Sequence, residues 1–133
     1  MHIEAIDHLV LTVKDISATL DFYSCVLGME IVTFGAGRHA LRFGHQKINL
    51  HEQGCELEPK AVRPTPGSAD LCFVTQTPLT EVIAQLTRYG IVLVDGPVTR
   101  TGAIGPILSV YLRDPDLNLI ELSNYLTSGE KQP

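Results

Sequence analysis

The sequence predicts an α+β fold made of two tandem copies of one unit, in which a strand and a helix are followed by three more strands. Two helical segments end at glycines, and subtracting Gly28 from Gly90 gives a separation of 62 residues. His8 and Asp70, in the strand-like runs before those helices, are also 62 residues apart. A constant separation between corresponding positions indicates an internal duplication.

The first copy is expected at approximately residues 1–53. Branched apolar residues in DHLVLTV (7–13) predict a strand, and Asp15 is placed to cap the helix that follows. Gly28 supplies the left-handed residue that ends this helix. The apolar face of the helix is expected to contain Ile16, Leu20, Tyr23 and Leu27. Three further strands are expected in MEIVTF (29–34), HALRFG (39–44) and QKINLHE (46–52).

The second copy, at approximately 68–126, repeats this order. ADLCFVT (69–75) predicts its first strand, and Thr77 and Pro78 begin a helix with Leu79, Val82, Ile83 and Leu86 on its apolar face. Strands are expected in IVLV (91–94), ILSVYLRD (107–114) and LNLIELS (117–123), with VTRTGAIGP (98–106) as an inserted loop. The polar, proline-bearing stretch 54–68 joins the copies. Because neither copy alone encloses a core, we expect residues 1–133 to form a single domain.

Composition excludes several classes of function. With 44% hydrophobic and 19% charged residues, the chain is typical of a soluble globular protein, and no apolar run is long enough to span a membrane. The first residues lack a secretion signal, which favours the cytoplasm. A formal charge of −5 with scattered Lys and Arg makes nucleic acid an unsuitable partner. The odd number and wide spacing of Cys25, Cys55 and Cys72 indicate reduced thiols, and Cys72 is expected to be a small core residue.

Four polar residues interrupt strand patterns that are otherwise apolar. Aligning the apolar positions of INLHE with those of NLIEL puts His51 opposite Glu121, and the 62-residue separation puts His8 opposite Asp70. Each residue alone is most simply a hydrogen-bonded strand residue. Together, two imidazoles and two carboxylates at duplicated positions are consistent with either a divalent transition-metal site or a hydrogen-bonded polar cluster.

The duplicated pattern, with DHLVLTVKDISATLDFYSCVLGME at the front and DPDLNLIEL at the back, resembles the vicinal oxygen chelate superfamily of glyoxalases, bleomycin-resistance proteins and extradiol dioxygenases. INLHE, EPKAVRPTPGSADLCF and RTGAIGP are similar to lactoylglutathione lyase-like proteins, some labelled virulence-associated. The resemblance implies curved mixed sheets around a metal-binding cleft, and a homodimer. Whether modules pair within one chain or across the dimer is left open.

The resemblance further implies His8, His51, Asp70 and Glu121 as ligands of a divalent ion such as Zn, Ni, Mn or Fe. Bacterial glyoxalase I alternates histidine and glutamate in each half, whereas here both histidines precede both carboxylates. Asp70, with its shorter side chain, either binds the metal directly or orients a ligand.

The reaction that the resemblance implies is that of a lyase or isomerase, which stabilises an enolate of a small oxo or hydroxy-acid derivative, including thiol conjugates. Glu121 is then either a proton-moving base or a structural ligand. Arg100, in the expected loop, is either a solvated charge or a group that holds a substrate carboxylate or phosphate. The alternatives are a metal-free small-molecule binding or resistance protein and an Fe(II) dioxygenase. Leu117 replaces the glycine common in the DPDGN turn, at an expected cost of about 1 kcal/mol.

Overall fold

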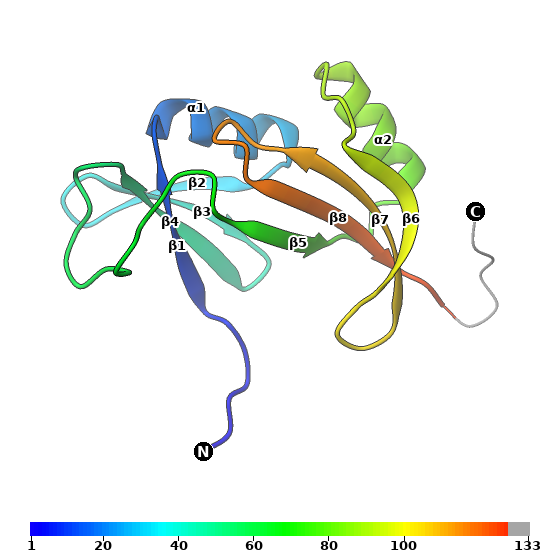
Figure 1. The fold of residues 1–133 in the computed structure, drawn as a ribbon, viewed down its shortest axis with the longest axis horizontal. Coiled ribbons are helices and arrows are strands. Elements are labelled where there is room, and N and C mark those ends of the chain that lie inside the picture. Colours follow the sequence, from blue (N-terminus) through cyan, green and yellow to red (C-terminus); the bar gives the residue numbers. More distant parts are fainter. Residues whose placement is uncertain (128–133) are drawn as a thin grey trace. The chain divides into compact units, whose positions relative to one another are not determined.

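The computed structural model describes residues 1–127 and divides the chain into two compact units, Met1–Ala69 (unit 1) and Asp70–Pro133 (unit 2). Each unit contains one four-stranded mixed sheet and one helical segment (Figure 1). The predicted α+β fold of two strand–helix–three-strand copies is therefore confirmed. That the two copies together make one domain stays a prediction.

Unit 1 has the strand order β1-β4-β3-β2, in which β1 and β4 are parallel and the other neighbours are antiparallel. Its strands are β1 (His8–Val13), β2 (Glu30–Phe34), β3 (Arg38–Phe43) and β4 (Gln46–Glu52). These bounds agree with the predicted runs to within one residue, because the branched apolar patterns are continuous and glycine turns separate them.

The helical segment of unit 1 begins as predicted, because the Asp15 side chain accepts a hydrogen bond from Ala18 N at 3.0 Å. It consists of α1 (Ile16–Asp21) followed by a π-helical turn, η1 (Phe22–Val26). A π-helical turn is wider than an α-helical turn and therefore changes which side chains face the sheet. The buried positions are Thr19, Tyr23 and Val26. Of the predicted apolar face, Tyr23 is therefore buried, whereas Ile16, Leu20 and Leu27 are partly buried.

Unit 2 repeats the arrangement with the order β5-β8-β7-β6, and β5 and β8 are its parallel pair. Its elements are β5 (Asp70–Val74), α2 (Leu79–Arg88), β6 (Asp95–Thr101), β7 (Pro106–Arg113) and β8 (Leu119–Tyr125). The segment 54–68 contains no helix or strand, as expected for the connection between the copies.

The prediction of a strand at IVLV (91–94) is wrong, because the strand begins at Asp95 instead. Ile91 N donates to Leu86 O at 3.0 Å, so this run closes the end of α2 before pairing begins at Val94. The register between β6 and β7 then shifts between Asp95 and Val98, around Gly96. Much of the expected loop 98–106 is consequently strand.

The side chain of Asn124 on β8 makes hydrogen bonds to the residues at and before the start of α2. Its amide nitrogen donates to the carbonyls of Thr75 and Thr77, both at 2.9 Å, and its amide oxygen accepts from Leu79 N at 2.9 Å. Pro78, the cap residue of α2, makes no side-chain cap hydrogen bond. Asn124 therefore supplies the acceptor that the first turn of this helix needs.

A tight turn joins β7 to β8, and the buried carboxylate of Asp114 organises it. Asp114 Oδ1 accepts from the backbone N–H groups of Asp116 and Asn118, both at 2.9 Å, and Oδ2 accepts from Asn118 Nδ2 at 2.8 Å. Leu117 adopts φ 68°, so the left-handed conformation expected at this position is present despite the side chain. The turn fixes the register of the β7–β8 hairpin.

Each sheet has one apolar face packed against its helical segment and one opposite face, here called the helix-free face. Strand alternation separates the two sets of side chains. The buried residues of the apolar faces include Leu11, Val13, Leu41, Ile48 and Leu50 in unit 1, and Val110, Leu112, Ile120 and Leu122 in unit 2. The predicted α2 residues Leu79, Val82 and Leu86 are buried as well. Polar side chains are thus left for the helix-free faces.

Candidate functional site

Glu121 lies on the helix-free face of unit 2, where two serine hydroxyls converge on one of its carboxylate oxygens. Ser109 Oγ donates to Glu121 Oε2 at 2.6 Å, and Ser123 Oγ donates to the same oxygen at 3.3 Å. The two hydroxyls also contact each other at 2.7 Å, and both serines are fully buried. Such contacts hold a half-buried carboxylate in one orientation.

Arg100 lies on the same face as Glu121 and contacts Tyr111, the residue that is paired with Glu121 in the β7–β8 register. Arg100 Nε donates to the Tyr111 hydroxyl at 3.1 Å, and Arg100 Nη2 lies 3.6 Å from Asp95 Oδ2. Burial raises the pKa of Tyr111, as does the Glu121 charge, while the Arg100 hydrogen bond opposes the change. Arg100 is on β6, so its predicted place in a loop is wrong.

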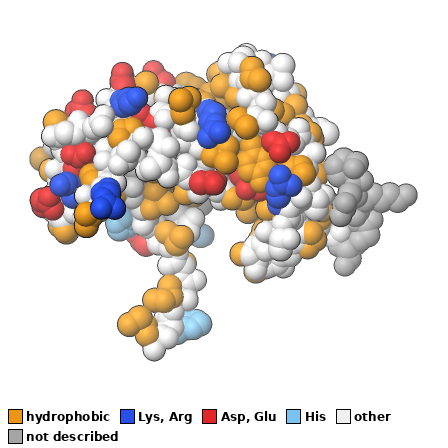
Figure 2. Space-filling view, in the orientation of Figure 1, with side chains coloured by type: hydrophobic (Ala, Val, Ile, Leu, Met, Phe, Trp, Pro, Cys, Tyr) orange, Lys and Arg blue, Asp and Glu red, His pale blue; other side chains and the backbone are white. Residues whose placement is uncertain are grey.

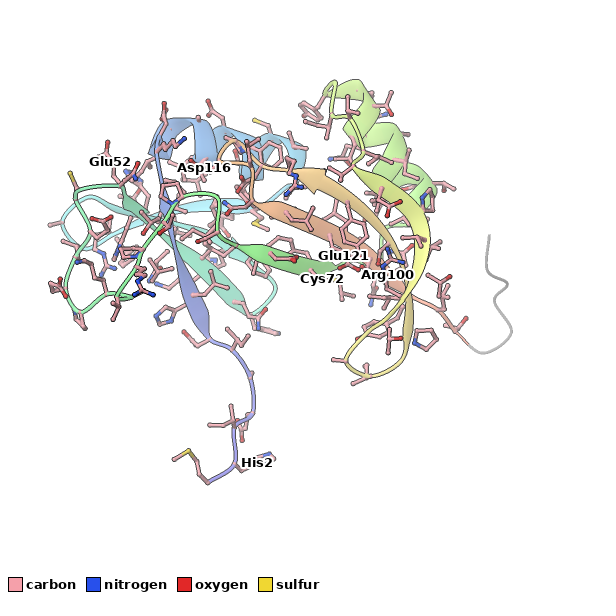
Figure 3. All side chains as sticks on the ribbon, viewed as in Figure 1. His2, Glu52, Cys72, Arg100, Asp116 and Glu121 are labelled. Carbon is pink, nitrogen blue, oxygen red and sulfur yellow. The ribbon has the colours of Figure 1, made fainter. Side chains whose placement is uncertain are left out.

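Cys72 is not the core residue that its strand pattern predicts. It is exposed and stands beside Glu121 in the β5–β8 register, because alternation directs Leu71 and Phe73 to the other face. Cys72 Sγ lies 3.3 Å from Ser123 Oγ. Partial burial raises the pKa of the Cys72 thiol; the Glu121 and Asp70 carboxylates raise it further, against the effect of Ser123. Figure 3 shows Cys72, Glu121 and Arg100 on β5, β8 and β6.

Asp70 is exposed at the start of β5 and is paired with Leu119, two residues before Glu121 on β8. Two residues of a strand span about 7 Å, so Asp70 and Glu121 form a diagonal pair on one face. Unit 2 therefore brings both predicted carboxylates to the same part of its sheet.

His8 occupies the corresponding position in unit 1, at the start of β1. It is exposed, and its Nδ1 lies 2.8 Å from Asp7 Oδ2. A carboxylate on one ring nitrogen orients the imidazole and leaves Nε2 for another partner.

The strand register of unit 1 assigns Asn49, and not His51, to the position that corresponds to Glu121. His8 is paired with Lys47 and Asp70 with Leu119, so the diagonal neighbour of His8 is Asn49. His51 is paired with Thr12 and corresponds to Ser123. The predicted equivalence of His51 with Glu121 therefore differs by two residues from the equivalence that the strand register shows. Apolar alternation has a period of two, so it fits both alignments equally well.

Asn49 has a second distinguishing property. It is 6% exposed, and its Oδ1 is the one buried side-chain oxygen or nitrogen without a hydrogen-bond partner among residues 1–127. His51 is also buried. A buried amide oxygen without a donor is costly unless a ligand supplies its partner.

The donor types suit a divalent ion, although no group of three or more His, Cys, Asp or Glu within residues 1–127 is arranged to hold one. Unit 1 presents His8 with the orphaned Asn49 Oδ1, and unit 2 presents Asp70 with a serine-oriented Glu121. Imidazole nitrogen, carboxylate oxygen and amide oxygen are each an ordinary ligand type for a first-row divalent metal.

Sequence comparison agrees with the fold. Residues 5–122 match the Glyoxalase/Bleomycin resistance protein/Dioxygenase superfamily, and the chain belongs to this superfamily. The resemblance drawn from the sequence is thereby confirmed.

Particular relatives are similar over nearly the whole chain. Virulence protein STM3117 of Salmonella typhimurium is 62% identical over 126 residues, which are 95% of this chain and 88% of that protein. Its crystal structure has a TM-score of 0.93, covering 95% of this chain and 100% of that chain. Glyoxalase domain-containing protein RDO1 of Mycosarcoma maydis is 57% identical over 125 residues, 94% of this chain and 70% of that protein.

A functionally named structure is more distant. Lactoylglutathione lyase from Agrobacterium tumefaciens is 25% identical, with a TM-score of 0.68, and covers 90% of this chain and 92% of its own.

No helix in residues 1–127 is long and apolar enough to cross a membrane. In the view of Figure 2, Lys and Arg side chains are interspersed with acidic ones and form no continuous basic stripe.

Proposed function

We propose that this chain is a divalent-metal-dependent lyase or isomerase of glyoxalase type, acting on a small oxo or hydroxy-acid derivative, including thiol conjugates. The observation that supports this most is the repeated diagonal pair, His8 with Asn49 in unit 1 and Asp70 with Glu121 in unit 2. Each unit supplies two donors, and four donors leave coordination positions for water or substrate.

His8, Asp70 and Glu121 are three of the proposed ligands. For the fourth, His51 was expected from sequence, while the strand register and the orphaned Oδ1 favour Asn49. The metal, Zn, Ni, Mn or Fe, supplies Lewis-acid stabilisation of negative charge on a substrate oxygen.

The residues of unit 2 account for the proton transfer. Glu121 removes the proton alpha to the substrate carbonyl, and the two serine hydroxyls on Oε2 keep its carboxylate directed during the transfer. Tyr111 is paired with Glu121 and accepts a hydrogen bond from Arg100, so it lies on the face where the proposed substrate binds. Arg100 is a candidate to hold a substrate carboxylate, in competition with Asp95.

Metal analysis of the purified protein tests this proposal. We expect one bound divalent ion per site, which chelation removes and Ni, Zn, Mn or Fe restores. His8→Ala and Glu121→Gln should weaken metal binding about 10- to 100-fold, and Asp70→Asn less if Asp70 only orients a ligand.

Asn49→Ala and His51→Ala form the decisive comparison. Weaker metal binding in Asn49→Ala alone supports the register assignment, and weaker binding in His51→Ala alone restores the assignment made from sequence. If no variant and no metal has an effect, the chain is a metal-free small-molecule binding protein. Oxygen consumption with catechols in the Fe(II)-loaded protein would instead identify a dioxygenase.

We also propose that the protein is a cytoplasmic homodimer. This rests on likeness to its superfamily, and light scattering of the purified chain measures the oligomeric state directly.

A further inference from the structure

Two cations on the helix-free face of unit 1 share one aromatic ring. Arg38 Cζ lies 4.7 Å from the centre of the Phe34 ring, and Lys47 Nζ lies 4.1 Å from it. Their charges can therefore be no farther apart than the sum of those distances. All three side chains are half-buried, on β3, β2 and β4.

Neither cation has a carboxylate partner within the described part of the chain. The nearby Arg42, on the same face, differs in this respect, because Glu30 binds it through two hydrogen bonds of 3.1 and 2.8 Å. Two like charges held close together repel each other, and a ring quadrupole compensates this only in part. A bound anion would compensate the remaining repulsion between these two cations.

The position of the two cations relates them to the proposed ligand pair. Lys47 is paired with His8 in the β1–β4 register and precedes Asn49 by two residues on the same face. A group bound by Lys47 and Arg38 therefore lies on the sheet surface that carries His8 and Asn49. The aromatic ring between them fixes the cations while leaving their N–H groups to donate.

We infer that Arg38 and Lys47, positioned by Phe34, form a binding site for the anionic group of a small molecule, either a carboxylate or a phosphate. Arg38 provides the planar fork that binds two oxygens of such a group, and Lys47 provides a point charge. If this site binds the substrate, the substrate is an acid and not a neutral carbonyl compound; that conclusion rests on the proposed function and deepens it. The binding of an anion by Arg38 and Lys47 does not itself require a metal.

The test uses the full-length, chelator-treated protein labelled with nitrogen-15. Glycolate, its neutral analogue glycolamide and inorganic phosphate are titrated separately, while the backbone amides of Phe34, Arg38 and Lys47 and the Arg38 side-chain Nε–H are followed by NMR. We expect saturable shifts with glycolate or phosphate and none with glycolamide. The anion that binds with the higher affinity shows whether the site prefers a carboxylate or a phosphate. Added salt should weaken the binding of that anion.

Arg38→Gln and Lys47→Gln should each weaken binding about tenfold, the loss of one charge-assisted contact. Arg42→Gln is the matched control, since it removes a cation that already has a partner, and it should leave the affinity within about twofold. Phe34→Leu should weaken binding through loss of positioning, whereas a spectrum that keeps its dispersion shows that the variant is folded.

The inference is overturned if glycolamide binds as well as glycolate, if neither anion saturates, or if Arg42→Gln weakens binding as much as Arg38→Gln. Because the protein is free of metal in this experiment, failure here leaves the metal proposal intact, and failure of metal binding leaves this result intact.

Discussion

The Ser109 hydroxyl donates to Glu121 Oε2 across 2.6 Å, the shortest of the contacts that orient this carboxylate. Ser109 is completely buried and comes from the strand beside that of Glu121, so its position is set by the hairpin register. An oriented carboxylate is what both a metal ligand and a proton-transferring base require.

Replacing Ser109 with alanine should therefore affect the site more than the fold. We expect Ser109→Ala to lower metal affinity about tenfold, and to reduce unfolding free energy by about 1 kcal/mol through loss of the hydrogen bond. Metal titration and denaturant unfolding measure the two effects. Ser24→Ala, which removes a long 3.4 Å contact to Asp21 O in unit 1, is the control. Unchanged affinity in Ser109→Ala would show that this contact does not orient Glu121 for metal binding.

The reactivity of Cys72 should report the charge of its neighbours. The Glu121 and Asp70 carboxylates help to raise the pKa of the Cys72 thiol, so removing either charge should lower that pKa. More thiolate is then present at mildly alkaline pH, and alkylation becomes faster.

This effect is measured as the iodoacetamide rate against pH, in a background where Cys25 and Cys55 are serine. The profile of Glu121→Gln should move to lower pH than that of the parent, with Asp70→Asn moving less because its effect is the smaller. Glu81→Gln, on the exposed side of α2, should leave the profile in place. A Glu121→Gln profile identical to the parent would contradict the electrostatic contact.

Replacing Leu117 with glycine should raise the stability of the protein. It is 67% exposed and adopts φ 68°, a conformation that costs a residue with a Cβ about 1–2 kcal/mol. Leu117→Gly removes this cost but increases the entropy of the unfolded chain, for an expected net gain of about 0.5–1 kcal/mol. Leu117→Ala keeps the Cβ and should not gain. Thermal unfolding of both variants separates backbone strain from loss of the exposed side chain, and equal stability of the two would argue against strain.

Gly96 should tolerate no side chain, because a Cβ there would overlap the carbonyl oxygen of Ser109. Gly96→Ala is expected to destabilise the protein by more than about 2 kcal/mol, since both the positive φ and the overlap must be accommodated. Gly90→Ala, at φ 70° with no atom within 4 Å of the added carbon, should cost only the conformational part, about 1 kcal/mol. Denaturant unfolding gives both values, and equal losses would show that β7 moves aside without cost.

The sequence was sufficient for the fold because its repeats and turn residues are local signals. Gly28 and Gly90 both adopt φ 70°, as the helix ends required, and Asp15 caps its helix. Two deviations arise from features without such a signal. They are the π-helical turn that contains the buried Tyr23, and the delayed start of β6 beside its register shift between Asp95 and Val98.

The candidate site was only partly predictable. Glu121, Asp70 and His8 stand out because a charged or titratable group interrupts an apolar strand. Asn49 was missed because a neutral amide beside His51 carries no such signal, and because alternation cannot distinguish registers that differ by two residues. Ser109 and Ser123 were missed because small hydroxyl residues are ordinary in strands. Only the register reveals that they face Glu121.

The hydrogen bonds of Asn124 to the chain before α2 have a consequence for local unfolding. The helix begins at Leu79 with its cap supplied by the strand that contains Glu121, so its first turn cannot fray independently of β8. Amide protons at the start of α2 and along the end of β8 should then exchange with solvent in a shared opening event, as one cooperative unit. Two segments that lie 45 residues apart in sequence should therefore open at the same rate in the native state.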